Sequence, residues 1–379
     1  MNESLEENEV EINERSCISK VLSFVGEYWF FLGLYVGISL SYLYPDLGKT
    51  GGYIRSEWTV KYGCIIFVFF LNGLSIKTKE FLKEILHIRL HLFIQFSSLC
   101  FIPFTIYFLH KFFLKISLNE ILVCGLILLG SGSTTISSNV IMTKNAMGNE
   151  NGALINAILG NILSVFISPI LILYFVKHSS IFHQFFSNEK SVDYQSVIQE
   201  LILIVLIPFL LGQIIHSIWR KQIDFLRNKC QFSQLTNVTL LIVIWSVFST
   251  SFANEIFKKI SGKDLLLLIF VDLTLYLSFS LIIFVISRLV IRFCEYSKED
   301  SIAITFCGSM KSVAMVISLV NCFFQKEDEQ IIAVVLLPAI IYHLQQLILS
   351  PFLVILFQKW ILSNENSPPI NQTEILLSN

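Results

Sequence analysis

Long apolar runs separated by short polar stretches follow one another along most of the chain. Each run is about 20 residues long, the length with which a helix crosses about 30 Å of hydrocarbon. The pattern predicts ten membrane-spanning helices, at roughly 28–44, 58–76, 89–110, 120–144, 152–176, 195–219, 233–253, 265–287, 300–324 and 330–358. Together they make residues 26–360 one membrane domain, between a polar segment at 1–25 and a polar tail at 361–379 whose composition predicts disorder.

The fourth apolar run is interrupted by polar residues where lipid-facing side chains would be expected. Residues 130–145, GSGSTTISSNVIMTKN, crowd hydroxyl and amide groups into successive positions and begin with two glycines. Backbone that opens inside a bilayer must be hydrogen-bonded by neighbours, by water or by a solute. We therefore predict a helix broken near the middle of the membrane, as transporters use to present backbone groups to a ligand. A continuous helix whose small residues allow close packing is the alternative.

Matching motifs in the two halves of the chain indicate an internal repeat. Ser168–Pro169 in the fifth span and Ser350–Pro351 in the tenth are 182 residues apart (350 − 168), close to half the chain. The break in the fourth span has a counterpart in the ninth, at CGSMKS, residues 307–312. Because five is an odd number of spans, the second copy must be inverted in the membrane. The predicted fold is an all-α polytopic membrane protein with two inverted five-helix repeats, about 26–177 and about 194–360.

Composition and charge narrow the class further. Hydrophobic residues make up 54% of the chain and charged residues 15%, which leaves no room for a sizeable soluble domain, and the net charge of −1 suggests no nucleic-acid partner. The eight cysteines lack metal-ligand spacing, so no metal site is expected. No phosphate loop or nucleophile elbow is present, and we expect no enzyme activity. Lysines and arginines favour the loops after the second, sixth and eighth spans, which predicts cytoplasmic termini.

Lys311 is the most informative single residue. A lysine inside an apolar run costs about 3 kcal/mol on insertion scales and marks a functional site by default. It follows Gly308 and Ser309 and so lies at or just after the predicted break, where the N-terminal end of a half-helix carries partial positive charge. Together these charges favour an anionic ligand. The alternative is a misplaced span in which Lys311 extends to the membrane surface.

Asp272, inside the eighth span, is the candidate counter-charge for Lys311 or a proton carrier. It could equally lie shallow in the membrane, hydrogen-bonded by Thr274 or Tyr276. Further polar side chains inside spans are Asn72, Gln95, Asn156, Asn161 and His343. His343 precedes Pro351 by the eight residues that separate Asn161 from Pro169, so the repeat makes the two equivalent. These groups could bind a cation or a solute, or they could only join helices.

Six segments resemble a divergent branch of the bile acid:sodium symporter superfamily. They are FFLNGLSIKTKEF (69–81), LHLFIQ (90–95), SSNVIMTKNAMGNE (137–150), PFLLGQI (208–214), AITFCGSMKS (303–312) and LLPAIIYHLQQ (336–346). The resemblance covers about 20–360. It implies ten helices in two inverted repeats, with broken fourth and ninth helices that cross near the substrate and sodium sites.

The resemblance also implies ligands for the sodium ion. Ser138 and Asn139 match a Ser-Asn pair of the fourth helix, Asn156 and Asn161 lie in the matching region of the fifth, and Gln95 matches a third-helix glutamine. The ninth helix departs from the pattern. There Phe306 and Met310 stand where sodium-coupled members have a glutamate and a glutamine, and Lys311 replaces an uncharged residue.

The expected function is secondary transport of an organic anion or another small solute across a lipid bilayer. Lys311 would stand in for a sodium ion, which puts sodium coupling in doubt and leaves protons, through Lys311, His343 or Asp272, as the alternative. The expected central site comprises Gln95, Ser138, Asn139, Asn156, Asn161, Ser309, Lys311, Ser312 and His343. The resemblance also allows a non-transporting regulator of calcium homeostasis and secretory-pathway glycosylation, and a passive channel is a third possibility. Plasma membrane, endoplasmic reticulum and Golgi, like the oligomeric state, stay open.

Overall fold

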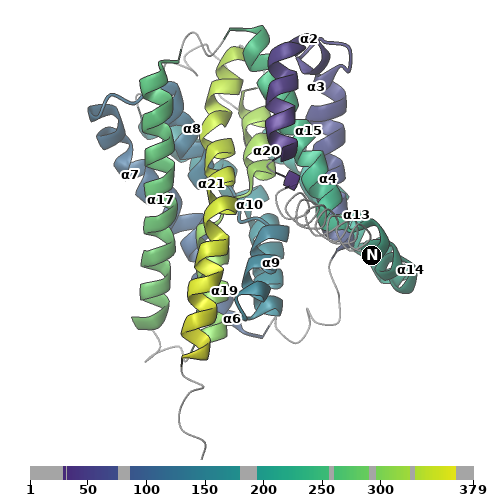
Figure 1. Ribbon diagram of the computed structural model, residues 1–379, viewed down its shortest axis with the longest axis vertical. Helices are drawn as coiled ribbons and strands as arrows, with labels where there is room; N and C mark the ends of the chain where they lie inside the picture. Colours follow the sequence, from purple (N-terminus) through teal and green to yellow (C-terminus); the bar gives the residue numbers. More distant parts are fainter. Residues whose placement is uncertain are drawn as a thin grey trace, which may run out of the picture.

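The computed structural model describes residues 29–30, 32–75, 86–179, 194–255, 260–289, 296–324 and 329–363. All regular structure within these ranges is helical. The expected cytoplasmic segment 1–25 lies outside the described residues, as does most of the expected tail 361–379. Figure 1 shows the helices running along the long axis of the molecule.

The helices keep one order from end to end. They are Leu32–Leu43, α2 (Pro45–Gly48), α3 (Ser56–Trp58), η1 (Thr59–Cys64), α4 (Ile65–Leu74), α6 (Ile88–Phe96), η2 (Ser97–Phe101), α7 (Ile102–Lys115), α8 (Glu120–Ser131), α9 (Ser137–Asn145), α10 (Glu150–His178), α12 (Tyr194–Leu201), η3 (Ile202–Leu206), α13 (Ile207–Ile218), α14 (Arg220–Cys230), α15 (Phe232–Ala253), α17 (Gly262–Leu289), α19 (Lys298–Ser309), α20 (Val313–Phe323) and α21 (Glu329–Leu362). The stretches η1, η2 and η3 are π-helical turns that join α-helices without a break.

Seven of the described helices are long and apolar enough to cross a membrane, which makes the chain a polytopic membrane protein. The two shorter apolar helices are Leu32–Leu43 and Glu120–Ser131. The prediction of ten crossings is therefore neither confirmed nor refuted by length alone. Lys298–Phe323 is 94% buried over its apolar window, against 39% for Gly262–Leu289. The ninth predicted span is thus the centre of the molecule, and the eighth faces outward.

Both predicted helix breaks are present. Helix α8 ends at Ser131, and α9 begins at Ser137 after an extended segment. Helix α19 ends at Ser309, and α20 begins at Val313. Each break lies between two buried half-helices, so the backbone groups that it frees must find partners inside the protein.

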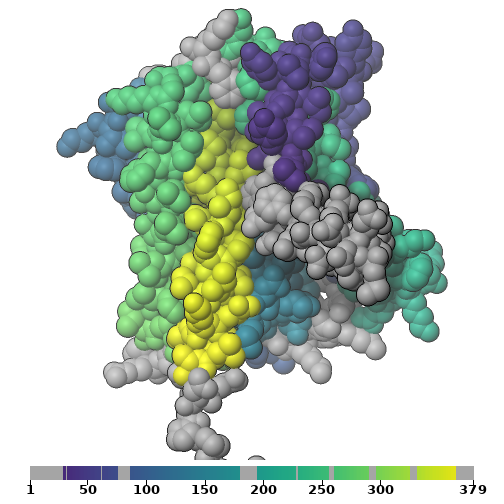
Figure 2. All heavy atoms as spheres, in the orientation of Figure 1, coloured from purple at the N-terminus to yellow at the C-terminus, as the bar shows by residue number. Residues whose placement is uncertain are grey.

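Two groups of helices surround the breaks. Helix α4 packs against α13 and α15, whereas α8 packs against α7 and α21, and α17 packs against α19 and α21. Figure 2 shows the atoms of α17 and α21 meeting along one face of the molecule. Between α4 and α13 the backbones themselves touch, because a Cβ at Gly73 would lie 3.2 Å from Gly212 Cα. Glycine is required at this contact, since only it lets two helices approach so closely.

Candidate functional site

The two helix breaks meet in the interior of the protein. The Ser312 amide donates a hydrogen bond of 2.8 Å to the Ser133 carbonyl, which joins the segment before α20 to the segment after α8. A Cβ at Gly132 would lie 2.6 Å from the Val316 side chain, so the fourth-helix break also packs directly on α20. The predicted convergence of the two interrupted helices therefore exists in three dimensions.

Lys311 fills a cage of oxygen atoms at this junction. Its ammonium donates to the carbonyls of Ser98 at 2.6 Å, Gly130 at 2.9 Å and Gly132 at 2.9 Å, with the Ser98 hydroxyl at 3.3 Å. The side chain is 1% exposed. Gly130 and Gly132 lie at the C-terminal end of α8, where carbonyls lack partners within the helix and carry partial negative charge. The ammonium therefore caps α8 from inside the protein.

The Ser98 carbonyl is available to Lys311 because of a local feature of the third predicted span. In η2 the amide of Ile102 donates to the carbonyl of Ser97, five residues back. The corresponding donor for Ser98 would come from Pro103, which has no N–H. The π-helical turn and the proline thus leave one buried carbonyl without a backbone donor, and Lys311 supplies it.

No acid balances the Lys311 ammonium. Its four hydrogen-bond partners are neutral oxygens, and the described residues contain no ion pair between Lys311 and Asp272. The expectation that Asp272 is its counter-charge is therefore wrong, because the cage already uses the donors of the ammonium. The charge is also enclosed, so it does not point toward a solute.

Gln346 holds the backbone at the ninth-helix break. Its side-chain oxygen accepts from the Lys311 amide at 2.9 Å, and its amino group donates to the Lys311 carbonyl at 3.0 Å. The same amino group lies 2.8 Å from His343 Nδ1, which accepts and leaves the imidazole neutral with its proton on Nε2. The Tyr342 hydroxyl donates to the Ser309 carbonyl at 2.8 Å. One turn of α21 thus satisfies most of the backbone that the break exposes.

Asn161 does the same for the fourth-helix break. Its amino group donates to the carbonyls of Thr134 at 3.1 Å and Ala157 at 2.7 Å, and its oxygen accepts from the Ser133 hydroxyl at 3.0 Å. Asn139, from the first turn of α9, donates to the Thr134 hydroxyl at 2.5 Å. An amide side chain from the helix that follows each break therefore ties down that break.

Two buried amide oxygens near this region have no hydrogen-bond partner among the described residues. They are Gln95 Oε1 and Asn139 Oδ1. The amino group of Gln95 donates to the Asn156 carbonyl at 2.8 Å, and the amino group of Asn156 donates to the Gly152 carbonyl at 2.8 Å. Free amide oxygens are ligands that a hard cation prefers. They are the remnant of the sodium ligand set that the resemblance implied.

The rest of that set does not fit a sodium ion. Phe306 and Met310 are fully buried, and Phe306 packs edge-on against Phe357 at 5.7 Å. Both present apolar atoms where sodium-coupled relatives are expected to offer oxygen. A cation bound there would lack the carboxylate that offsets its charge. The described residues also contain no cluster of three acidic, histidine or cysteine side chains that could hold a metal.

A small cavity of about 20 Å³ lies beside the breaks, room for about one water molecule. Its lining includes Asn72, Ser138, Asn161, Ser312 and His343. The structure thus brings together four of the predicted site residues, and it places Asn161 and His343 on one cavity, as their equivalent spacing predicted. In this conformation the centre is closed to any larger solute.

The other predicted residues are Gln95, Asn139, Asn156, Ser309 and Lys311. They do not line this cavity but form the hydrogen bonds that shape the breaks. Their buried polar atoms therefore position the site rather than contact its contents.

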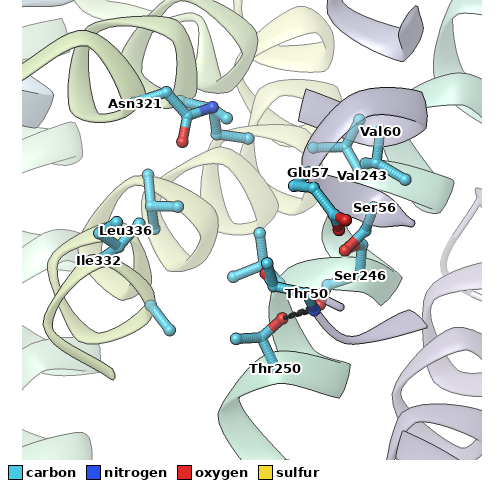
Figure 3. A pocket seen from close by; sticks show the side chains of 13 residues that line it. Thr50, Ser56, Glu57, Val60, Val243, Ser246, Thr250, Asn321, Ile332 and Leu336 are labelled. Carbon is cyan, nitrogen blue, oxygen red and sulfur yellow. Dashed lines mark hydrogen bonds between the residues drawn. The ribbon is translucent and has the colours of Figure 1, made fainter. Parts of the chain in front are cut away.

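A larger cavity of about 280 Å³ opens near α2 and α3 at one end of the molecule (Figure 3). Glu57 and Ser56 approach it from one wall and Asn321 from the opposite wall, while the Thr50 amide donates to the Thr250 hydroxyl at 3.3 Å. The Ser56 hydroxyl is buried and has no partner among the described residues. The charged residue that lines the cavity is Glu57, whose pKa is lowered by the hydrogen bond from the Gly51 amide.

Sequence reasoning missed several residues of the site. Gln346 lies in the same polar stretch as His343, three residues later, and a polar residue one helical turn away was the available signal. Ser98 could have been found from Pro103, because a proline leaves a carbonyl in the preceding turn without a donor. Glu57 lies between two apolar runs, and nothing in the sequence distinguishes it from other loop acids.

Comparison with known proteins agrees with this geometry. The chain matches the SBF-like CPA transporter family over residues 28–359. It belongs to this family. Among curated relatives, it is 31% identical over 356 residues to sodium/bile acid cotransporter 7 of Rattus norvegicus, covering 94% of this chain and 100% of the relative. The Danio rerio protein of the same name is 31% identical over 332 residues, with 88% and 94% covered.

A fungal relative extends the comparison. Solute carrier RCH1 of Candida albicans is 29% identical over 390 residues, covering 94% of each chain. The resemblance to a divergent branch of the bile acid:sodium symporter superfamily is thereby confirmed. The chain is a membrane transporter of that type, and the names of its relatives point away from an enzyme.

Proposed function

We propose that the protein is a sodium-independent secondary transporter of a small solute, in which the Lys311 ammonium takes the place of a coupling cation. The observation that carries the proposal is the cage of Ser98, Gly130 and Gly132 carbonyls around Lys311 Nζ. Carbonyl oxygens replace the hydration shell of a cation in transport proteins. Here the covalently attached ammonium receives that coordination permanently.

The architecture that we propose is ten membrane crossings in two inverted repeats. It is supported by one broken helix in each half, by Pro169 and Pro351 at matching places in α10 and α21, and by an amide clamp on each break. In such folds two half-helices meet at the membrane midplane, and the repeats rock around them.

The orientation that we propose puts both termini and the basic end of the molecule in the cytoplasm. This end, toward the bottom of Figure 1, carries α14, the end of α17 and the start of α19. Its basic residues include Arg220, Lys221, Arg227, Lys229, Arg288 and Lys298. The 280 Å³ cavity near α2 and α3 then faces the opposite side of the membrane and serves as the solute entrance.

The charge of the solute follows less directly. The expectation of an anion depended on Lys311 facing the solute, and the cage removes that support. Glu57 gives the entrance a negative charge instead. The proposal is therefore a small polar solute, with no preference for an anion.

The experiment compares thermal unfolding of the purified protein in sodium chloride and in choline chloride. Wild type and Lys311→Met should respond equally to both salts, because the ammonium or the thioether chain fills the cage. Lys311→Ala empties the cage, so sodium should bind its carbonyls and raise the Tm. At a sodium concentration 100 times the Kd, such binding contributes about 2.7 kcal/mol.

Lys144→Ala is the matched control, because Lys144 is an exposed lysine of α9 that pairs with Glu150. Its Tm should not depend on the choice of cation. If sodium raises the Tm of wild type, a sodium site exists beside Lys311, and the protein is an ordinary sodium symporter.

A further inference from the structure

Asp272 is a carboxyl group enclosed in the membrane domain and outside the site described above. It lies on α17, whose buried residues Leu268, Val271, Leu275, Tyr276 and Phe279 recur at helical spacing. This stripe faces the protein, and the opposite face, with Phe270 and Leu281, is exposed toward lipid. Asp272 belongs to the inner stripe and is 0% exposed.

Neither oxygen of Asp272 has a hydrogen-bond partner among the described residues. No described lysine, arginine or histidine lies within ion-pair distance, and the donors of Lys311 are used by its cage. Among the described residues, Asp272 is also the one buried aspartate or glutamate. An acid in this position has no structural partner to account for it.

The titratable groups that face Asp272 are neutral. Tyr276 is on its own helix, and Tyr342 of α21 is near enough for the charge of Asp272 to act on it. The two phenol rings meet edge-on at 5.7 Å. Helix α19 packs on α17 further along, around Ile283 and Gly308, and contributes no charge there. An ionised carboxylate would thus be buried without a donor or a counter-ion, which is strongly unfavourable, so the group carries a proton.

Tyr342 connects Asp272 to the ninth-helix break. The Tyr342 hydroxyl donates to the Ser309 carbonyl at 2.8 Å, at the last residue of α19 and two residues before Lys311. If Asp272 loses its proton, the carboxylate becomes a stronger acceptor for that hydroxyl than the carbonyl is. The phenol would then turn from Ser309 toward Asp272, and the break would lose one of the hydrogen bonds that fix it.

We propose that Asp272 is the proton-binding site of this transporter. The carboxyl is protonated in the conformation described here and releases the proton when α17 and α21 part and water enters between them. Figure 2 shows the two helices meeting at the outer surface, where such an opening would form. The inference rests on the proposed transport function and names its coupling ion, a proton in place of sodium.

The test is the pH dependence of thermal unfolding of the purified full chain, for wild type, Asp272→Asn and the control Asp264→Asn. Asp264 is in the first turn of the same helix and is partly exposed. In wild type, unfolding exposes Asp272 and releases its proton at neutral pH, so Tm falls as pH rises. One such proton changes the folding equilibrium constant about tenfold per pH unit. Asp272→Asn should lose this slope, and Asp264→Asn should keep it.

Equal slopes for wild type and Asp272→Asn would overturn the proposal. If Asp272→Asn does not fold, infrared spectra of the wild type decide instead. Exposed carboxyls are ionised at neutral pH. A protonated-carboxyl band that persists at neutral pH is therefore expected, and its absence would also overturn the proposal. The sodium response of the Lys311 variants is a separate measurement, so failure of the proton site can be told from failure of sodium-independent transport.

Discussion

Replacing Gln346 by leucine tests whether the ninth-helix break depends on a single side chain. Gln346 accepts from the Lys311 amide at 2.9 Å and donates to the Lys311 carbonyl at 3.0 Å, and it is fully buried. Leucine has a similar volume, so the change removes the two hydrogen bonds without opening a large cavity. Both backbone groups of Lys311 are then left inside the protein without a partner.

The magnitude follows from these two groups. A buried backbone donor or acceptor that loses its partner costs about 1–3 kcal/mol, so Gln346→Leu should lower the free energy of unfolding by about 2–6 kcal/mol. The neighbouring Gln345 provides the matched control. It donates one hydrogen bond, to the Ile269 carbonyl at 2.8 Å, and Gln345→Leu should cost about 0.5–1.5 kcal/mol.

The assay is the unfolding of both variants and wild type in the same detergent, followed by helical circular dichroism. The clamp also positions the Lys311 side chain, so Gln346→Leu should in addition let Lys311 react with an amine reagent that leaves it untouched in wild type. If Gln346→Leu is no less stable than Gln345→Leu, and Lys311 stays protected, the break is held by packing alone, and our account of the clamp is refuted.

Two further predictions concern packing and access. Gly212→Leu should abolish folding, because its Cβ would lie 2.9 Å from the Leu74 amide on the facing helix, whereas Gly37→Ala should be tolerated with its Cβ 3.7 Å from Trp245; expression and size-exclusion profiles compare the two. Ser138→Cys, introduced after the native cysteines are replaced, should react with a membrane-impermeant thiol reagent from either side of the membrane, because a transporter opens its centre alternately; reactivity from one side only would refute alternating access.

Much of the fold was predictable because lipid restricts what the backbone can do. Every backbone group in hydrocarbon must be hydrogen-bonded within the protein, so apolar runs become helices and polar interruptions become breaks. The predicted spans at 152–176, 195–219 and 233–253 coincide closely with α10, α12–α13 and α15. The interruption at residues 130–145 marked the fourth-helix break for the same reason.

The roles of the polar residues were harder to predict. The sequence marked Lys311 as exceptional, but it suggested an anion site and an acidic partner. The structure instead gives Lys311 a cage of carbonyls, two of them from a helix end more than 170 residues away in the chain. Carbonyl oxygens are present at every residue, so no composition or spacing could show which of them would be free.

The sequence alone thus determined the membrane class, the helices, the two breaks and the positions of the costly polar groups, because the hydrocarbon imposes these one residue at a time. Only the tertiary structure decided which polar groups meet. It paired Gln346 with Lys311, left Asp272 without a partner and placed Glu57 at the wall of the larger cavity. Hydrogen bonds reach about 3 Å, and contacts at that range depend on how helices distant in sequence pack against one another.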